Sequence, residues 1–202
     1  MTTTENKVTF GLKDLVLFFE NDNGAATAID SIINYNRTMN VTTTDLYAND
    51  SLYFRLNDEK NGDGTMELAY LPKAVVARML GWRIDSNGGL VHIKDAKPER
   101  FDMCFSVDGD QYARRKFVYG CEASMTADNN ETRGENVNFR TEQATITEYG
   151  VDHQGEHVWD YTIYEADDPT NFAASKTQVV YPAAAGSDTD TDSDSDSDTI
   201  SA

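Results

Sequence analysis

Short runs in which apolar and polar residues alternate recur along the chain, and Gly, Asn and Asp separate many of them. Residues 52–56 and 66–71 are typical, and residues 15–19 form a continuous run of aliphatic and aromatic side chains. Aromatic and β-branched residues favour strands, and alternation is the two-residue period of a half-buried strand. Strands are also expected at residues 7–10, 90–93, 100–107, 115–119, 138–149 and 157–164. The pattern predicts about nine or ten strands in an antiparallel β fold.

One segment has a helical period instead. Four apolar side chains between residues 75 and 80 would share one face of a helix. Pro72 suits the first turn because it has no N–H to leave unpaired, and Gly81 suits the position just beyond the last turn. We therefore expect one short α-helix, packed across an open face or edge of the sheet.

A polar stretch of nine residues, 57–65, separates two of the predicted strands. Gly62 and Gly64 would supply positive φ in a hairpin loop at this place. The stretch is longer than a tight turn needs.

The same stretch has some features of a calcium loop. Glu59, Asn61 and Asp63 alternate as the first three ligands of an EF-hand loop do, and Gly64 follows. The twelfth position, which needs a bidentate carboxylate, is Tyr70, and the flanking runs alternate like strands rather than helices. A polar hairpin loop is therefore favoured over a calcium site.

The chain is strongly acidic, with 35 acidic and 17 basic residues and a net charge of −18. Six of the acids alternate with Ser and Thr near the C-terminus, which leaves 29 in the rest of the chain. An acidic surface repels phosphate and offers no dense stripe of Lys and Arg. Stable binding to nucleic acid or to an anionic membrane is therefore disfavoured.

The composition divides the chain into two parts. Residues 1–182 are long enough for one β domain with a proper core, whereas residues 183–202 are of low complexity and repel themselves, so we expect a disordered Asp/Ser/Thr-rich tail. The first residues contain no apolar signal segment, and no run of eighteen apolar residues occurs. We expect a soluble protein without membrane insertion.

Few residues suggest chemistry. His153 and His157 have a spacing that places two imidazoles on one face of a helix for zinc, but Gly155 between them favours a hairpin. Cys104 and Cys121 are expected to be reduced thiols. The chain has no nucleophile elbow, no phosphate-binding loop and no Cys-x-x-Cys pair, so we predict no catalytic residues, metal or cofactor.

Several segments recur in a characteristic order: residues 6–13, 45–50, the hairpin with its glycine-bearing loop, 66–72 at the start of the helix, 80–81, 98–105, the turn at 108–110, 114–123 and 142–147. Taken together, they resemble the major tail proteins of long non-contractile-tailed phages, the phi13-type family. The resemblance covers residues 6–150 and fits residues 151–182 more loosely, so that these form a candidate C-terminal arm.

The resemblance implies an antiparallel β-sandwich or barrel of the phage tail tube type. It implies a structural virion protein of the phage tail, made and assembled in the host cytoplasm, whose copies form hexameric rings. The rings would stack helically into a conduit for the genome, with transient passage of DNA. Other partners would be the tape measure protein, the tail terminator and the distal tail proteins.

The resemblance also implies two kinds of functional residue. A loop between the strands would reach the neighbouring ring, and acidic residues on strands would line the channel. The channel candidates are Glu67, Glu142 and Glu148. The predicted inter-ring loop comprises Asn57, Asp58, Glu59, Lys60, Asn61, Gly62, Asp63 and Gly64.

Two other functions remain open from the sequence. A monomeric β-sandwich that binds carbohydrate or calcium would use Trp82, Trp159 and the acidic loops. An acidic hydrolase would need two carboxylates about 5 to 10 Å apart in a cleft, and nothing in the sequence brings such a pair together.

Overall fold

The structure is a computed structural model of the 202-residue chain. It describes residues 11–22, 24–107, 113–124 and 141–184. The predicted strand at residues 7–10, the Asp108–Asp110 turn and the acidic tail from residue 185 onward lie outside these ranges. Within them the chain is mainly β and every pair of adjacent strands is antiparallel, so the predicted fold class is confirmed.

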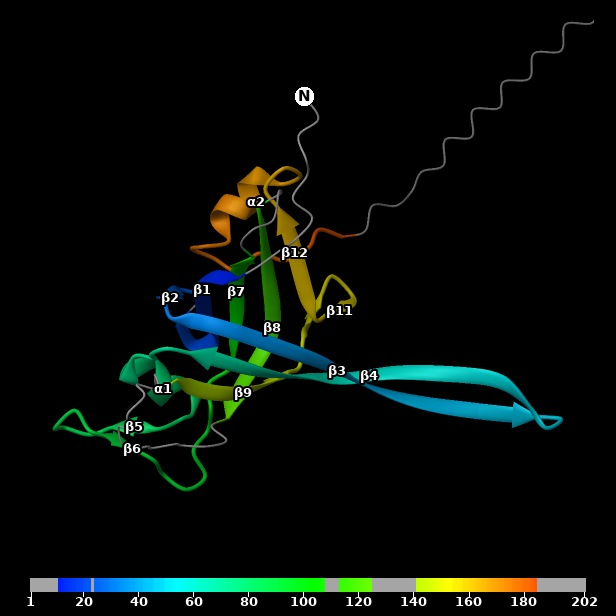
Figure 1. Ribbon diagram of the computed structural model, residues 1–202, viewed down its shortest axis with the longest axis horizontal. Coiled ribbons are helices and arrows are strands. Elements are labelled where there is room, and N and C mark those ends of the chain that lie inside the picture. Colours follow the sequence, from blue (N-terminus) through cyan, green and yellow to red (C-terminus); the bar gives the residue numbers. More distant parts are fainter. Residues whose placement is uncertain (1–10, 23, 108–112, 125–140, 185–202) are drawn as a thin grey trace, which may run out of the picture.

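The main sheet has eight strands in the order β2-β1-β7-β8-β9-β4-β3, and β12 adds to one end of β8 (Figure 1). Two small hairpins, β5–β6 and β10–β11, extend from it. The strands of the main sheet are β1 (Leu12–Phe19), β2 (Ala26–Ile29), β3 (Ile32–Ala48), β4 (Ser51–Leu68), β7 (Phe101–Val107), β8 (Arg114–Ser124), β9 (Glu142–Glu148) and β12 (Asp160–Tyr164). The hairpin strands are β5 (Arg83–Ile84), β6 (Leu90–Val91), β10 (Val151–His153) and β11 (Glu156–Val158).

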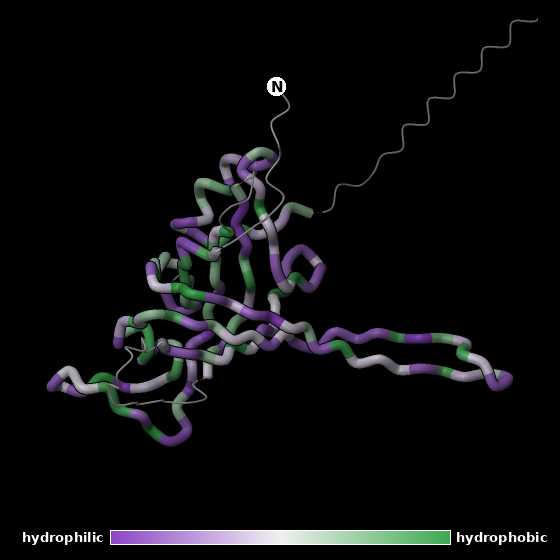
Figure 2. The backbone as a smooth tube through the Cα atoms, viewed as in Figure 1, coloured by the Kyte–Doolittle hydropathy of each residue, from purple (hydrophilic) through white to green (hydrophobic). Residues whose placement is uncertain are grey.

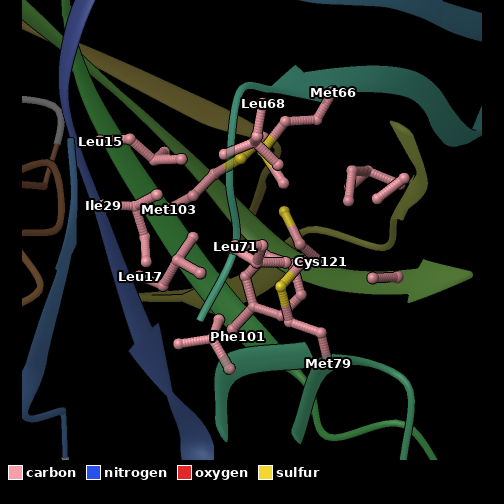
Figure 3. Close-up of a cluster of buried hydrophobic side chains, with 14 of the residues drawn as sticks. Leu15, Leu17, Ile29, Met66, Leu68, Leu71, Met79, Phe101, Met103 and Cys121 are labelled. Carbon is pink, nitrogen blue, oxygen red and sulfur yellow. The ribbon is translucent and has the colours of Figure 1, made fainter. Parts of the chain in front are cut away.

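The sheet buries side chains on both faces, because consecutive residues of a strand point to opposite sides. On one face Leu15 and Leu17 of β1 pack with Met103 of β7 and Met79 of helix α1 (Figure 3). On the other face Phe18 and Phe117 belong to a second, smaller cluster. The central strands β1, β7 and β8 are therefore covered on both sides.

The predicted helix is present as α1 (Lys73–Met79), and its apolar side chains are buried in the first cluster. It begins after Pro72, and Gly81 has φ +66° just beyond its end. An added Cβ at Gly81 would lie 2.3 Å from the carbonyl oxygen of Lys97, so both the turn and the close approach require glycine. The start and stop signals were read correctly.

A second short helix, α2 (Pro169–Ala174), was not predicted, and a 3-10 turn, η1 (Glu20–Asp22), follows β1. The Asp168 side chain caps α2 by accepting a hydrogen bond of 3.0 Å from the backbone N–H of Asn171. Pro169 occupies the first turn. The Asp-Pro pair was therefore a start signal that the sequence contained.

Residues 151–184 pack against the body of the sheet. β12 pairs with the first half of β8, and β9 pairs with the second half. Gly120 (φ +61°) lies between the halves, and an added Cβ there would be 2.3 Å from the carbonyl oxygen of Gly150. Val180 and Tyr181 complete the second apolar cluster. The boundary proposed at residue 182 is not tested by these contacts and stays a prediction.

The most prominent feature is a hairpin formed by β3 and β4, which are 17 and 18 residues long (Figure 1). Its turn is at Asn49 and Asp50, which have φ of 51° and 58°. Two consecutive residues with positive φ are typical of a type I′ turn, whose twist matches that of the flanking strands. The outer part of the hairpin, residues 41–60, projects away from the body and is hereafter called the arm.

The prediction of a loop at residues 57–64 is wrong. These residues belong to β4 and pair with β3, so the chain turns at residues 49–50 instead. The positions of Gly62 and Gly64 leave no room for a side chain, because other side chains cross over them. An added Cβ would lie 2.6 Å from Glu148 Oε2 at Gly62 and 2.5 Å from the Tyr35 hydroxyl oxygen at Gly64. β3 was not predicted, because seven of its 17 residues are Asn or Thr, which separate its apolar side chains.

Gly64→Ala tests this explanation. We expect it to lower the free energy of unfolding by about 1–3 kcal/mol, because the new methyl group must displace the Tyr35 ring from a packed position. Urea denaturation would measure the change. Thr65→Ser, on the exposed side of the same strand, is the control and should change stability by less than about 0.5 kcal/mol. Equal stability of both variants would contradict the close contact.

Candidate functional site

The arm exposes large apolar side chains in unusual number. Seven of them lie within its twenty residues, and Tyr53, Phe54 and Tyr47 are 76%, 55% and 65% exposed. In Figure 2 the arm carries hydrophobic segments far from the core. The seven are Val41, Leu46, Tyr47, Leu52, Tyr53, Phe54 and Leu56.

These side chains lie on both faces of the arm. Leu46 is opposite Phe54, so the two share one face, whereas Tyr47 is opposite Leu52 on the other. A bulge between these two pairs adds Tyr53 to β4. The distal ribbon has two strands only and pairs with no third strand among the described residues. A two-stranded ribbon is marginal on its own in water, so both faces of the arm are suited to being covered by other surfaces.

A buried polar network anchors the root of the arm. Arg37 of β3 donates to Glu148 of β9, with 2.5 Å between Nε and Oε2, and also to Asp160 of β12. The Tyr35 hydroxyl donates to the other oxygen of Glu148, whose side chain is fully buried. Lys116 Nζ lies 3.3 Å from Asp160. Three strands are thus tied together where the arm leaves the body.

Burial and hydrogen bonds shift two protonation equilibria in this network. Burial, supported by the bond to Glu148, raises the pKa of the Tyr35 hydroxyl far above its usual range. Burial opposes the charge of Arg37, but the bonds to Asp160 and Glu148 outweigh it and raise the guanidinium pKa. Both groups keep their protons, so the bonds that they donate persist at ordinary pH.

A second candidate surface is a polar face on four strands. Residues directly opposite one another form rows across the sheet, such as Thr38, Asp63, Thr147 and Glu122. The face comprises Asn34, Asn36, Thr38 and Asn40 of β3, Asn61, Asp63, Thr65 and Glu67 of β4, Gln143, Thr145 and Thr147 of β9, and Glu122 and Ser124 of β8.

The polar face contains three acids and no Lys or Arg among these residues. Amide groups hold two of the acids: Asn40 Nδ2 is 2.6 Å from Asp63, and Asn34 Nδ2 is 2.7 Å from Glu67. At the rim, Arg100 lies 3.9 Å from Glu122. The face is therefore hydrated and acidic, and short polar side chains make it flat.

The three channel candidates lie in different environments. Glu67 is on the polar face. Glu142 follows the alternation of Ala144 and Ile146 and so points to the opposite side of the sheet. Glu148 is buried within one chain, so it is wrong as a channel-facing residue. Asp63 and Glu122 share the face with Glu67 but were not among the channel candidates. For Asp63 the sequence contained a signal, because polar residues alternate along β4 from Asn61 to Glu67.

The histidines of the candidate zinc spacing do not meet. They belong to the β10–β11 hairpin, where Asp152 is opposite His157 and His153 is opposite Glu156. Their side chains therefore point to opposite faces. His157 Nδ1 is 2.6 Å from Asp152 Oδ1, and the His153 ring stacks on Tyr181. The residues that the structure describes include no group of three or more His, Cys, Asp or Glu side chains placed to hold a metal ion.

The two tryptophans of the carbohydrate alternative are also separated. Trp82 precedes β5 and stacks on His92, with ring centroids 4.7 Å apart, whereas Trp159 lies between β11 and β12 and contacts His157. These elements are on different sides of the molecule (Figure 1). The structure brings no shared aromatic platform together from them.

The calcium alternative is not supported by the geometry of β4. Glu59, Asn61 and Asp63 lie along an extended strand, where alternate side chains are about 6 to 7 Å apart. An EF-hand loop instead curls its ligands around one ion.

Both cysteines are free and buried, on opposite faces of the sheet. Burial raises the pKa of the Cys104 thiol to about 12, and it raises that of Cys121 well above its ordinary value. Neither is suited to act as a nucleophile, since the thiolate is the reactive form. No helix in the described ranges is long and apolar enough to cross a membrane.

Comparisons of sequence with known families and with curated proteins give no match. Similar solved structures come from phage-like particles. The cap of the anti-feeding prophage, described as a tube terminating cap, has a TM-score of 0.47 and 11% identity over 81% of this chain and 99% of that chain. The sheath-tube complex of the extracellular contractile injection system PVC has a TM-score of 0.49 and 10% identity over 81% of this chain and 100% of that chain.

The baseplate of the anti-feeding prophage contains a third similar chain, with a TM-score of 0.40 and 10% identity over 81% of this chain and 97% of that chain. TM-scores below 0.5 at such low identity carry no functional argument. None of the three is described as a phi13-type tail protein, so that assignment stays a prediction.

Arg37→Ala tests the anchor of the arm. We expect it to lower the free energy of unfolding by about 3–5 kcal/mol, because Glu148 would keep a buried charge without its cation. Urea denaturation monitored by tryptophan fluorescence would measure this change. Arg55→Ala is the matched control, because Arg55 pairs with Asp45 on the exposed arm. Loss of this exposed ion pair should hardly change the urea concentration at which half of the protein is unfolded. If both variants unfold at the same urea concentration, the buried network is not the anchor.

Proposed function

We propose that the protein is a structural subunit of a phage tail, whose copies assemble into hexameric rings that stack into the tail tube. The observation that carries the proposal is the arm, with apolar side chains on both of its faces. Large exposed apolar patches on soluble proteins mark interaction surfaces, and here the patch lies on an extended ribbon. A ribbon of this shape fits between two surfaces of neighbouring copies.

The arm also takes over the inter-ring role that the resemblance implies for residues 57–64. Residues 57–60 are part of the arm and residues 61–64 lead into its root. In this proposal the contacts between copies involve the apolar side chains near the tip more than Glu59 or Asp63. The arm would reach a neighbouring copy because residues 41–60 extend beyond the part of the hairpin that pairs with β9.

The polar face is the proposed wall of the channel. Asp63, Glu67 and Glu122 would repel the phosphates of a passing genome, and no basic side chain within the face would hold them. Hydrated amides and hydroxyls present no apolar surface to the bases. The face therefore suits transient passage of DNA without stable binding.

The remaining parts of the proposal follow from the resemblance. The partners would be other copies of the chain, the tape measure protein, the tail terminator and the distal tail proteins, and the place of action would be the virion. The role is structural and involves no catalysis. Residues 1–182 would form the tube domain and residues 183–202 an appended tail.

Assembly is the first test. Electron microscopy of the concentrated protein should show rings or hollow tubes, and Phe54→Asp should prevent them, because the new carboxylate would be buried in an apolar contact. Gln178→Asp adds the same charge to an exposed polar position outside the arm and is the control. A wild-type protein that stays monomeric at high concentration, even with tape measure protein supplied, would refute the proposal.

Charge reversal tests the channel wall. Tubes of the Asp63→Lys/Glu67→Lys variant should retain short duplex DNA in a sedimentation assay at low salt, whereas wild-type tubes should release it, because the new cations attract phosphate. The Glu156→Lys/Glu165→Lys variant has the same net charge but changes exposed residues outside the face. Equal retention by both variants would place the channel wall elsewhere.

A further inference from the structure

A groove lies beside the small β5–β6 hairpin. Residues 82–98, hereafter called the flap, form one wall, and Leu80, just after α1, and the end of β8 contribute the rest. The groove is shallow and open to solvent, with a volume of about 610 Å³. The residues at its centre are Leu80, Trp82, His92, Ile93, Pro98 and Ala123.

The walls of this groove are largely apolar. The Trp82 ring stacks on His92 at an interplanar angle of 25° and also packs against the main core. Ile93 is 40% exposed at the groove. Lys73 of α1 donates to the carbonyl oxygen of Gly88 at 2.9 Å and so ties the flap to the helix. The exposed apolar lining of the groove is suited to contact aromatic or aliphatic side chains.

The flap and the arm lie at opposite ends of the molecule. In Figure 1, where the longest axis is horizontal, β5 and β6 are at one end and the tip of the β3–β4 hairpin is at the other. The protruding apolar arm of one copy could therefore contact the apolar groove of the next copy in a head-to-tail arrangement. Such heterologous contacts generate closed rings or open stacks.

The charges of the two surfaces are complementary. The flap contains three basic and two acidic residues, although the whole chain has a net charge of −18. The arm contains four acidic and two basic residues. Opposite charge steers association and selects among possible contacts. The basic residues of the flap are Arg83, Lys94 and Lys97, and the acidic residues of the arm are Asp45, Asp50, Asp58 and Glu59.

We propose that the groove beside the flap receives the tip of the arm of a neighbouring copy of the chain. This inference rests on the proposed self-assembly and names its receiving surface. Two arms pairing with each other would bring eight acids together against four bases and would leave both grooves open. Insertion of an arm into a groove covers both apolar surfaces with one contact.

A mixing experiment separates this contact from the alternatives. Phe54→Asp blocks the arm but keeps the groove, and Ile93→Asp blocks the groove but keeps the arm. Each variant alone should stay monomeric, or should need a concentration about tenfold or more higher to assemble. An equimolar mixture should give discrete dimers by light scattering, because one intact arm meets one intact groove and growth then stops.

Ile84→Asp is the matched control. Ile84 is 39% exposed and lies in the same flap, but it does not line the groove, so this variant should assemble like the wild type. If Ile93→Asp also assembles like the wild type while Phe54→Asp does not, the arm docks elsewhere, and the inference fails although the proposed function stands. If the wild type never assembles, both fail.

Chemical cross-linking supplies a second measurement that does not require a disrupted contact. Copies with Phe54→Cys and copies with Ile93→Cys should be joined by a short bis-maleimide, whereas Ile84→Cys should give no product with Phe54→Cys. Native Cys104 and Cys121 are 1% and 0% exposed and should not react. Cross-linking of Phe54→Cys copies to one another, without reaction at Ile93→Cys, would show arm-to-arm pairing and overturn the inference.

Discussion

The rest of the structure depends on one buried charge. Arg37 enters the space between three strands and meets Glu148, which has no exposure to solvent, and Asp160. A buried carboxylate without a cation would be strongly unfavourable, so the ion pairs favour the packing that brings Arg37 of β3 to Glu148 of β9 and Asp160 of β12. These groups lie near the place where the β3–β4 hairpin leaves the body of the sheet.

This constraint explains the composition of the strands around it. Gly62 and Gly64 give up side chains because the Tyr35 ring and the Glu148 carboxylate cross over β4 at these positions. The other face of the same strands needs no core residues and carries Asn, Thr, Asp and Glu instead. One pair of strands thus provides a buried anchor on one face, a hydrated acidic surface on the other and an apolar ribbon beyond the body.

The apolar core of the chain is covered, but apolar side chains at two ends of the molecule are exposed. The two apolar clusters cover both faces of β1, β7 and β8, whereas the arm and the groove beside the flap stay open to solvent. Apolar surface that a single chain cannot cover favours association. Assembly of copies would therefore add to the stability of the arm, which two strands alone cannot supply.

Local patterns in the sequence determined much of the fold. The aliphatic and aromatic runs at residues 15–19 and 100–107 predicted strands, and the helix signals around Pro72 and Gly81 predicted α1, because both depend on side chains that are near neighbours. The acidic balance that disfavours stable binding to nucleic acid was also evident. Tertiary structure alone decided the arm: a strand was expected at residues 52–56 but none at β3, and Gly62 and Gly64 near the root of the arm were interpreted as turn residues. It also decided that Glu148 is buried and Glu67 only partly buried, because identical carboxylates on neighbouring strands are distinguished only by the register of the sheet and the position of Arg37.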